Sequence, residues 1–199
     1  GLVGSEMCIR DRDRQTKKLT LIRDRIGEKP LYYGFVNGHF VFASDLGSIT
    51  QLDDFHNAID TRVLQIYFVH GYIPAPYSIY ENIYKLDAGC MLEMDAPYTE
   101  PKISAYWSVR EAARYGEAHP FKGTRQEAAD ELERLLKASI RDQMVADVPV
   151  GAFLSAGIDS STVVALMQAQ SNRKVRSFTI GMDDPKYNEA TYAKEIAQH

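Results

Sequence analysis

The stretch Val148-Pro-Val-Gly-Ala-Phe-Leu-Ser-Ala-Gly-Ile-Asp-Ser-Ser161 decides which fold to expect. Its first half, Val148 to Leu154, is a short apolar run whose β-branched content is typical of a strand buried on both faces, as in a parallel sheet. The second half, Ser155 to Ser161, predicts a tight turn, and 162–169 then has helical spacing. Because 175–180 predicts a second strand, the order strand, turn, helix, strand indicates a βαβ unit of an α/β fold.

The turn carries residue types that suit an anion at the carboxyl end of the strand. A turn that enters a helix leaves backbone N–H groups unpaired, and the helix dipole adds partial positive charge. Gly157 allows close approach of a ligand or a positive φ, while Ser155, Ser160 and Ser161 offer hydroxyl donors. Asp159 would repel phosphate unless a cation intervenes, and Mg²⁺ prefers carboxylate and phosphate oxygens. The pattern therefore favours a nucleotide whose pyrophosphate carries Mg²⁺.

An ordinary helix start explains part of the same pattern, because Ser and Asp are common N-caps and Gly is a common turn residue. That structural alternative explains less well why three hydroxyls, a glycine and an aspartate follow the apolar run within seven residues. The turn is not a Walker loop, since no Gly-Lys-Ser/Thr follows it.

Local signals upstream predict antiparallel strands and a helix. Asn37-Gly38 separates two strand-like runs and is a strong hairpin signal, so residues 19–44 are expected to form two or three antiparallel strands. Asp60 can cap the start of a helix over 60–70, and Gly71 can end it.

The middle of the chain is less regular. Short strands are expected within 83–107, and the polar residues 108–123 are interpreted as a linker. Thr124 and Glu127 then predict a capping box, followed by apolar residues at helical spacing. This helix is expected to run to about Val145.

The composition excludes several classes of protein. Lys and Arg number 23 against 27 Asp and Glu, a net charge of −4, which argues against a nucleic-acid partner. The longest apolar run is too short to span a bilayer, so no membrane association is expected. Cys8 and Cys90 give neither a disulfide framework nor metal-ligand spacing, and a reducing cytoplasm is the expected location. Residues 1–12 lack a sustained period and are interpreted as a non-native leader.

Several segments together are similar to one known family. The run 148–161 resembles the ATP-pyrophosphatase loop of glutamine-hydrolysing asparagine synthetases, whose usual form is L-S-G-G-(I/V/L)-D-S-S. Further matches follow in order; they are R-D-R-I-G-E-K-P-L-Y-Y-G (23–34), F-A-S-D (42–45), G-Y-I-P-A-P-Y-S-I-Y-E-N-I-Y-K-L (71–86), S-F-T-I-G-M (177–182) and Y-N-E-A (187–190). The resemblance covers residues 13–199, and the ordered set is far more specific than the loop alone.

The resemblance implies an incomplete α/β domain with a parallel sheet, of the ATP-pyrophosphatase (adenine nucleotide alpha-hydrolase-like) type. A few antiparallel strands from an N-terminal-nucleophile glutaminase domain would precede it. On this interpretation, 13–50 is the end of a type 2 glutamine amidotransferase domain. Residues 51–123 connect it to the synthetase domain and begin that domain, and 124–199 form the domain's N-terminal part.

The implied ATP-binding residues lie in the turn and at the two strand ends; they are Leu154, Ser155, Ala156, Gly157, Asp159, Ser160 and Ile180. Those of the turn would surround the phosphates, with Asp159 facing Mg²⁺ through the pyrophosphate. Leu154 and Ile180 would touch the adenine or the ribose, and sheet core is an equal alternative for both side chains. Ala156 replaces the family's usual first Gly, which is harmless if its φ is negative.

The activity implied by the resemblance is ATP-dependent amidation of aspartate through a β-aspartyl-AMP intermediate, with ammonia taken from glutamine. The implied small-molecule substrates are glutamine, aspartate and ATP, and the oligomeric state stays open, with a homodimer among the options. Met7-Cys8 imitates the family's N-terminal nucleophile. Six residues precede it, however, and that nucleophile needs a free α-amine as its base. We therefore expect no catalytic residue in this chain, and no activity from these 199 residues alone.

Two other functions remain as alternatives. The first is a related amidotransferase that acts on another carboxylate, from a sugar, a peptide or a small acid. The second is a non-catalytic nucleotide-binding module that has kept the loop.

Overall fold

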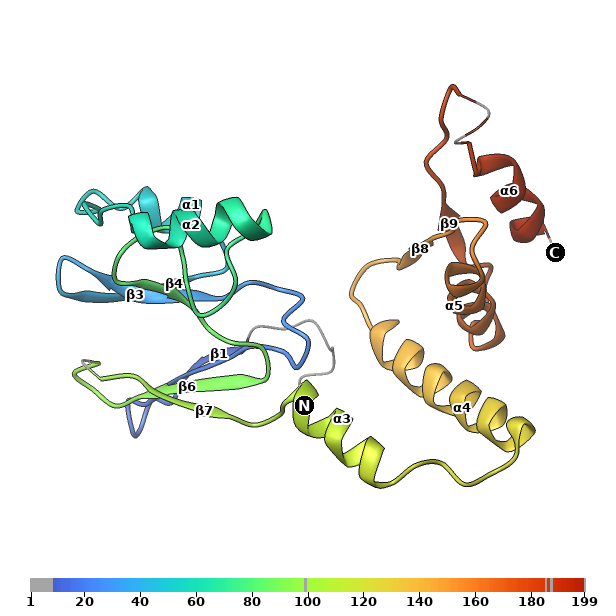
Figure 1. Ribbon diagram of the computed structural model, residues 1–199, viewed down its shortest axis with the longest axis horizontal. Coiled ribbons are helices and arrows are strands. Elements are labelled where there is room, and N and C mark those ends of the chain that lie inside the picture. The colour runs from blue at the N-terminus through green and yellow to red at the C-terminus, as the bar shows by residue number, and fades with distance from the viewer. Residues whose placement is uncertain (1–8, 99, 185, 187, 199) are drawn as a thin grey trace. The chain divides into compact units, whose positions relative to one another are not determined.

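Figure 1 shows the computed structural model of the chain, which describes residues 9–98, 100–184, 186 and 188–198. The chain divides into two compact units, one ending at Pro120 and the other beginning at Phe121. Within the described part, no helix has both the length and the apolar character needed to cross a membrane. The mixed α/β content is confirmed, with antiparallel sheets in the first unit and a small parallel sheet in the second.

Two antiparallel sheets form the first unit. The larger has the strand order β1-β2-β6-β7, and the smaller has the order β4-β3-β5. The strands of the larger sheet are β1 (Ile9–Arg12), β2 (Leu19–Ile22), β6 (Cys90–Met94) and β7 (Lys102–Ala105). Those of the smaller sheet are β3 (Tyr32–Val36), β4 (His39–Ala43) and β5 (Ile83–Lys85). The strands expected within 19–44 and 83–107 are thus confirmed, and 9–12 also pair with β2.

The hairpin between β3 and β4 forms where its two-residue turn was predicted. Asn37 and Gly38 have φ values of 47° and 77°, and Val36 pairs with His39 on either side of them. A two-residue turn with positive φ at both positions matches the right-handed twist of the flanking strands. This local chemistry fixes the register of the hairpin.

Apolar side chains from the two sheets form one core. Leu21 and Leu92 of the larger sheet are fully buried together with Leu31, which directly precedes β3. The two sheets therefore pack face to face. On the opposite face of the smaller sheet, α1 (Leu46–Thr50) packs through Ile49, as the arrangement in Figure 1 shows.

The helix expected over 60–70 is confirmed as α2 (Thr61–His70). The Asp60 carboxylate accepts the Arg62 N–H at 3.0 Å and so caps the first turn. Gly71 ends the helix with a φ of 73°, a left-handed conformation that glycine adopts without steric penalty.

The range 108–123, interpreted from the sequence as a linker, contains the helix α3 (Val109–Ala118). Ser108 is the N-cap, and its hydroxyl accepts the N–H of Glu111 at 3.5 Å. Ser-x-x-Glu is the sequence signature of a helix start, so a local signal for this helix was present. The helix buries none of its residues, which explains the weak apolar pattern.

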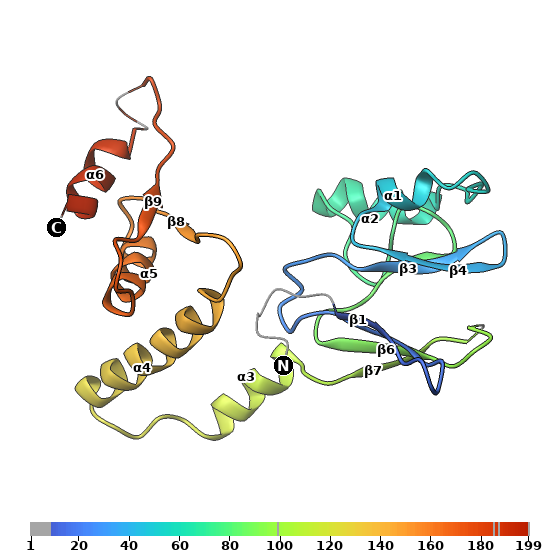
Figure 2. The same cartoon turned by 180° about the vertical axis from the view of Figure 1, so that it is seen from behind.

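The second unit contains three helices and two strands among its described residues. They are α4 (Arg125–Gln143), β8 (Gly151–Phe153), α5 (Ile158–Ala169), β9 (Arg176–Phe178) and α6 (Ala190–Gln198). β8 and β9 are parallel neighbours, which confirms the βαβ unit, and α4 lies against α5 (Figures 1 and 2). The capping box between Thr124 and Glu127 is confirmed, and α4 ends two residues before the expected Val145.

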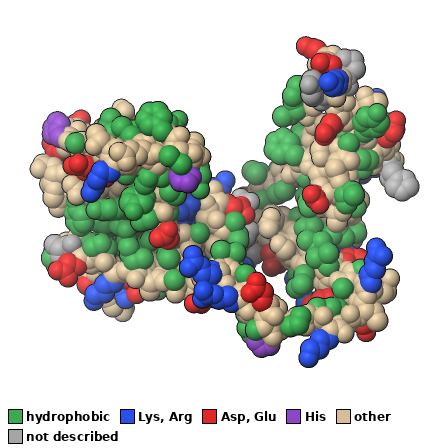
Figure 3. All heavy atoms as spheres, in the orientation of Figure 1, with side chains coloured by type: hydrophobic (Ala, Val, Ile, Leu, Met, Phe, Trp, Pro, Cys, Tyr) green, Lys and Arg blue, Asp and Glu red, His purple; other side chains and the backbone are tan. Residues whose placement is uncertain are grey.

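The expectation of a strand over 148–154 buried on both faces is wrong in both extent and burial. Only 151–153 form a strand, and Val148 and Phe153 are 71% and 80% exposed. Within the described residues the parallel sheet has two strands, and so narrow a sheet leaves much of each strand uncovered. The space-filling view shows hydrophobic side chains on the surface of this unit (Figure 3).

Candidate functional site

The bend between β8 and α5 is the candidate site, and the parallel sheet fixes where it begins. Leu154, 2% exposed, donates its N–H to the Phe178 carbonyl oxygen at 2.8 Å. The Thr179 hydroxyl donates to the Leu154 carbonyl oxygen at 2.7 Å. These two bonds continue the pairing beyond the strands, so the bend starts from a rigid point at their carboxyl ends.

Two serine hydroxyls close the bend. The Oγ atoms of Ser155 and Ser160 lie 2.8 Å apart, and the Ser155 N–H also donates to Ser160 Oγ at 3.1 Å. The Gly157 N–H donates to Ser155 Oγ at 3.1 Å. These contacts hold Ser155 at the end of the strand against the first turn of α5, so the bend has a defined shape without a ligand.

The first turn of α5 presents backbone donors that no side chain caps. Gly157 is the N-cap residue and has no side chain to accept a hydrogen bond. The N–H groups of the first turn, over 158–160, therefore point out of the helix end, together with the positive end of the helix dipole. This arrangement suits an anion that can accept several hydrogen bonds at once.

Gly157 and Ala156 both have ordinary backbone conformations. Gly157 has a φ of −75°, so the suggestion that it supplies a positive φ is wrong. The other suggested reason for a glycine here, close approach of a ligand to the backbone, is still open. A Cβ at Gly157 would meet only Ser155 Oγ, at 3.2 Å. Ala156 is not among the described residues with positive φ, which confirms that its methyl group is harmless to the backbone.

A pocket of about 460 Å³ opens beside the bend. It brings together four of the predicted ATP-binding residues, namely Leu154, Ser155, Ser160 and Ile180, whereas Ala156, Gly157 and Asp159 do not line it. Ile180 is 71% exposed, so the sheet-core alternative is wrong for its side chain, while it holds for the buried Leu154. The pocket is thus lined both by hydroxyl groups and by apolar side chains.

Five further lining residues were missed by sequence reasoning; they are Phe153, Phe178, Thr179, Met182 and Glu189. The segments S-F-T-I-G-M and Y-N-E-A were noticed as resemblances, but apart from Ile180 their side chains were not assigned to a site. Residues that follow the carboxyl end of a parallel strand are the signal that could have found them, because ligands bind at that edge.

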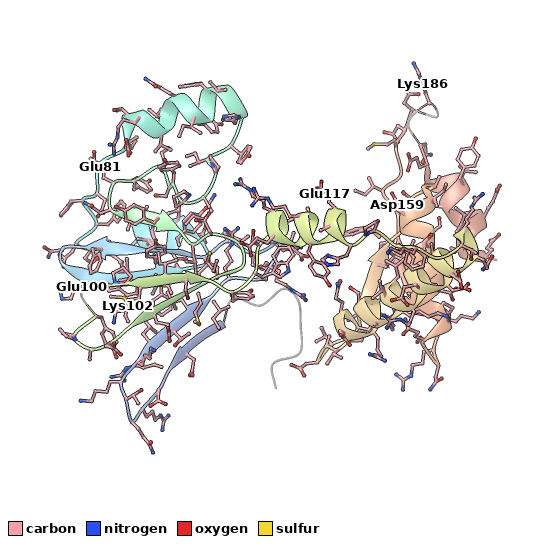
Figure 4. The ribbon with its side chains drawn as sticks, turned by 60° about the horizontal axis from the view of Figure 1, so that its bottom comes forward. Glu81, Glu100, Lys102, Glu117, Asp159 and Lys186 are labelled. Carbon is pink, nitrogen blue, oxygen red and sulfur yellow. The ribbon has the colours of Figure 1, made fainter. Side chains whose placement is uncertain are left out.

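Asp159 lies in the first turn of α5 with an exposed carboxylate, labelled in Figure 4. Within the described residues, no group of three or more His, Cys, Asp or Glu side chains could hold a metal ion. One exposed carboxylate fits a Mg²⁺ ion that takes most of its ligands from water or from a bound anion, because this ion keeps waters and binds few protein ligands. The residues do not fit a metal held by the protein alone.

In the first unit, Arg23 has a structural role. Its guanidinium donates to the carbonyl oxygens of Gly27, Lys29 and Leu86, at 2.7, 3.0 and 2.6 Å. All three acceptors are backbone atoms, which indicates that Arg23 packs the fold rather than binding a ligand. The sequence also predicts that Cys8, after Met7, is not the nucleophile of a glutaminase. Both residues lie outside the described part of the chain.

Burial changes the acidity of several side chains in this unit, and Tyr33 and Cys90 are two of them. It raises the pKa of Tyr33 to about 12, with the negative charges that Tyr84 and Asp87 can carry adding to the effect. Burial also raises the pKa of the Cys90 thiol, so the thiol stays protonated and weakly nucleophilic. Cys90 is therefore a packing residue.

Two family models match successive parts of the chain. The model described as a glutamine amidotransferase domain matches residues 7–107, just over half of the chain, and the model described as asparagine synthase matches residues 131–199.

Curated relatives match over most of the chain. A Methanocaldococcus jannaschii protein, provisionally named glutamine-hydrolyzing asparagine synthetase 2, is 35% identical over 190 residues. That alignment covers 94% of this chain and 35% of the relative. Glutamine-hydrolyzing asparagine synthetase 2 of Bacillus subtilis is 31% identical over 199 residues, which cover 94% of this chain and 25% of the relative. The chain thus spans about a third or less of the length of these relatives. Both domain models, in this order, and the relatives show that the chain belongs to the glutamine-hydrolysing asparagine synthetase family.

Proposed function

We propose that the bend between β8 and α5 binds the pyrophosphate of MgATP in an asparagine synthetase. The observation that carries this proposal is the uncapped first turn of α5 together with the Ser155–Ser160 hydroxyl pair, which lines a pocket. Backbone N–H groups and hydroxyls are neutral donors fixed before the ligand arrives. They can therefore stabilise phosphate charge with little reorganisation.

The residues of the bend have distinct roles in this proposal. Ser155, Ala156, Gly157 and Ser160 surround the phosphates, with Gly157 leaving room because it lacks a Cβ. Asp159 faces a Mg²⁺ ion carried by the pyrophosphate, which offsets the repulsion between carboxylate and phosphate. Leu154 and Ile180, at the ends of β8 and β9, contact the adenine or the ribose.

The reaction is the ATP-dependent amidation of aspartate. An oxygen of the aspartate β-carboxylate attacks the α-phosphorus, the bond from that phosphorus to the bridging oxygen breaks, and pyrophosphate leaves with its Mg²⁺. Ammonia then attacks the acyl carbon of the β-aspartyl-AMP intermediate, loses a proton and displaces AMP. The donors of the bend act in the first step, because negative charge grows on the leaving pyrophosphate.

Glutamine is the proposed source of the ammonia, and two findings support it. The amidotransferase model matches 7–107, and the curated relatives are named for glutamine hydrolysis. The proposed segments remain 13–50 for the end of the amidotransferase domain, 51–123 for the connection and 124–199 for the synthetase domain.

An exchange assay tests the synthetase proposal. The full-length protein is incubated with ATP, Mg²⁺ and labelled pyrophosphate, and label entering ATP is followed with and without aspartate. Exchange that requires aspartate is the expected result, because adenylation of the acceptor is reversible. Exchange with another carboxylic acid but not with aspartate would replace asparagine synthesis with the related amidotransferase. Nucleotide binding without exchange for any acid would favour a non-catalytic module.

A further inference from the structure

Glu189 is the one charged residue among those that line the pocket beside the bend. Its backbone is held in place, since its carbonyl oxygen accepts the Ala193 N–H at 3.0 Å and the next N–H, of Ala190, donates to Asn188 Oδ1 at 3.1 Å. Within the described part of the chain, no hydrogen bond or ion pair engages its exposed carboxylate. A charged acceptor with no protein partner thus borders a pocket that is otherwise made of apolar and hydroxyl side chains.

The chemistry of the pocket limits what this carboxylate can bind. Phosphate oxygens are excluded as direct partners, because two anions repel without a metal between them. The Watson–Crick edge of adenine offers one amino donor beside the N1 acceptor. If one carboxylate oxygen accepted the amino group, the other would face the lone pair of N1 and be repelled. A ribose offers two adjacent hydroxyl donors, which match the two oxygens of a carboxylate.

We propose that the Glu189 carboxylate accepts hydrogen bonds from the 2′ and 3′ hydroxyls of the nucleotide's ribose and makes the pocket selective for ribonucleotides. The proposal rests on the proposed nucleotide site and adds a specificity-determining residue to it. Ser155, Ser160 and Ile180 line the same pocket as Glu189. The proposed site puts the phosphates at the two serines and the adenine or the ribose at Ile180. The ribose joins these two parts of the nucleotide, and Glu189 lines the same space.

A simpler role competes with this one. Glu189 directly precedes α6, and a carboxylate at a helix N-terminus is stabilised by the helix dipole. That role predicts a loss of stability when the charge is removed, but it predicts no dependence on the hydroxyls of the sugar. The comparison of nucleotides therefore separates the two roles.

The test measures the Kd of MgATP and of its 2′-deoxy and 3′-deoxy forms for the full-length protein by titration calorimetry. The variants are Glu189→Ala and Glu189→Gln. Glu195→Ala is the control, because it removes an exposed carboxylate from α6, the helix that Glu189 directly precedes. We expect the unaltered protein and the control to bind MgATP about tenfold more tightly than either deoxy form, the size expected for hydrogen bonds to a charged group. In Glu189→Ala this preference should disappear, because MgATP loses two hydrogen bonds to the carboxylate whereas each deoxy form loses only the one made by its remaining hydroxyl. Glu189→Gln should lie between.

Two results would overturn the assignment. One is equal binding of MgATP and the deoxy forms by the unaltered protein. The other is a Glu189→Ala variant that weakens all three nucleotides by the same factor, as a purely structural role would. If the unaltered protein binds none of the three, the nucleotide site itself is wrong, which is a different failure from a lost preference.

Discussion

Ser155 and Ser160, five residues apart in sequence, are joined through hydroxyl oxygens 2.8 Å apart. Ser155 belongs to the segment leaving β8, and Ser160 belongs to the first turn of α5. Their contact determines the shape of the bend and leaves the backbone donors of the helix end open to an anion. One pair of side chains therefore links the stability of the βαβ unit to its proposed function.

Replacing Ser160 by alanine should lower stability more than replacing its neighbour. Ser160→Ala removes the contact to Ser155 Oγ and the acceptor for the Ser155 N–H, whereas Ser161→Ala removes a hydroxyl that donates to the Gly157 carbonyl oxygen. We expect Ser160→Ala to reduce the free energy of unfolding by about 2 kcal/mol, because two hydrogen bonds are lost. Ser161→Ala should reduce it by about 1 kcal/mol, because one hydrogen bond is lost. Urea denaturation measures both, and equal losses would contradict the role given to the pair.

Removing the Asp159 charge should affect nucleotide binding in opposite directions with and without Mg²⁺. With Mg²⁺, Asp159→Asn is expected to weaken ATP binding about tenfold, because a partner of the metal is lost. With the metal chelated, the variant should bind ATP at least as tightly as the unaltered protein, since a repulsive charge has gone. Asp147→Asn, another exposed aspartate of the second unit, is the control and should change neither Kd. Weaker binding by Asp159→Asn in both conditions would exclude the metal role.

Local chemistry explains which elements could be predicted. The Asn37-Gly38 turn, the Asp60 cap and the box of Thr124 and Glu127 depend on interactions within a few residues, so the sequence carries them in full. Ser108 and Glu111 carry the same kind of signal, and α3 was missed because its helix lacks a buried face. A capping signal therefore indicates a helix start even where the apolar periodicity is weak.

Burial and the outer part of the site could not be predicted, because both depend on distant residues. The apolar run 148–154 has the composition of a central strand, yet Phe153 is 80% exposed, since composition does not say which elements cover it. Glu189 lies 29 positions after Ser160 and lines the same pocket. Sequence reasoning identified the bend because a strand, a turn and a helix are contiguous there, whereas the rest of the pocket lining depends on the fold.

The start of α4 should lose stability in acid. Hydrogen bonds from the Thr124 backbone and then from its hydroxyl lower the pKa of Glu127 below its ordinary value of 4.5. A carboxylate with a depressed folded-state pKa contributes stability that is present above pH 4.5 and is lost as the pH falls through the lower, folded-state value. We therefore expect Glu127→Gln to be less stable than the unaltered protein near neutral pH, with the difference shrinking below pH 4.5.

Urea denaturation across this pH range, with Glu117→Gln of α3 as the control, checks that expectation (Figure 4). The control removes an exposed carboxylate that is not part of a capping box, so its stability difference should show no such decline. A Glu127→Gln difference that persists unchanged well below pH 4.5 would show that the charge of Glu127 does not strengthen the cap.

Two glycines with similar backbone conformations should respond differently to alanine. Gly38 and Gly89 have φ values of 77° and 67°, so a side chain strains the backbone at both positions. At Gly38 a Cβ would meet nothing within 4 Å, and Gly38→Ala should cost about 1 kcal/mol of unfolding free energy from the strain alone. At Gly89 the Cβ would overlap the Trp107 carbonyl oxygen, while the Gly89 carbonyl oxygen accepts the Tyr106 and Trp107 N–H groups at 2.9 and 3.2 Å. Because strain and overlap act together there, Gly89→Ala should lower the free energy of unfolding by about 3 kcal/mol. Urea denaturation of both variants measures the two losses. Similar losses would mean that residues 105–107 can move away from β6.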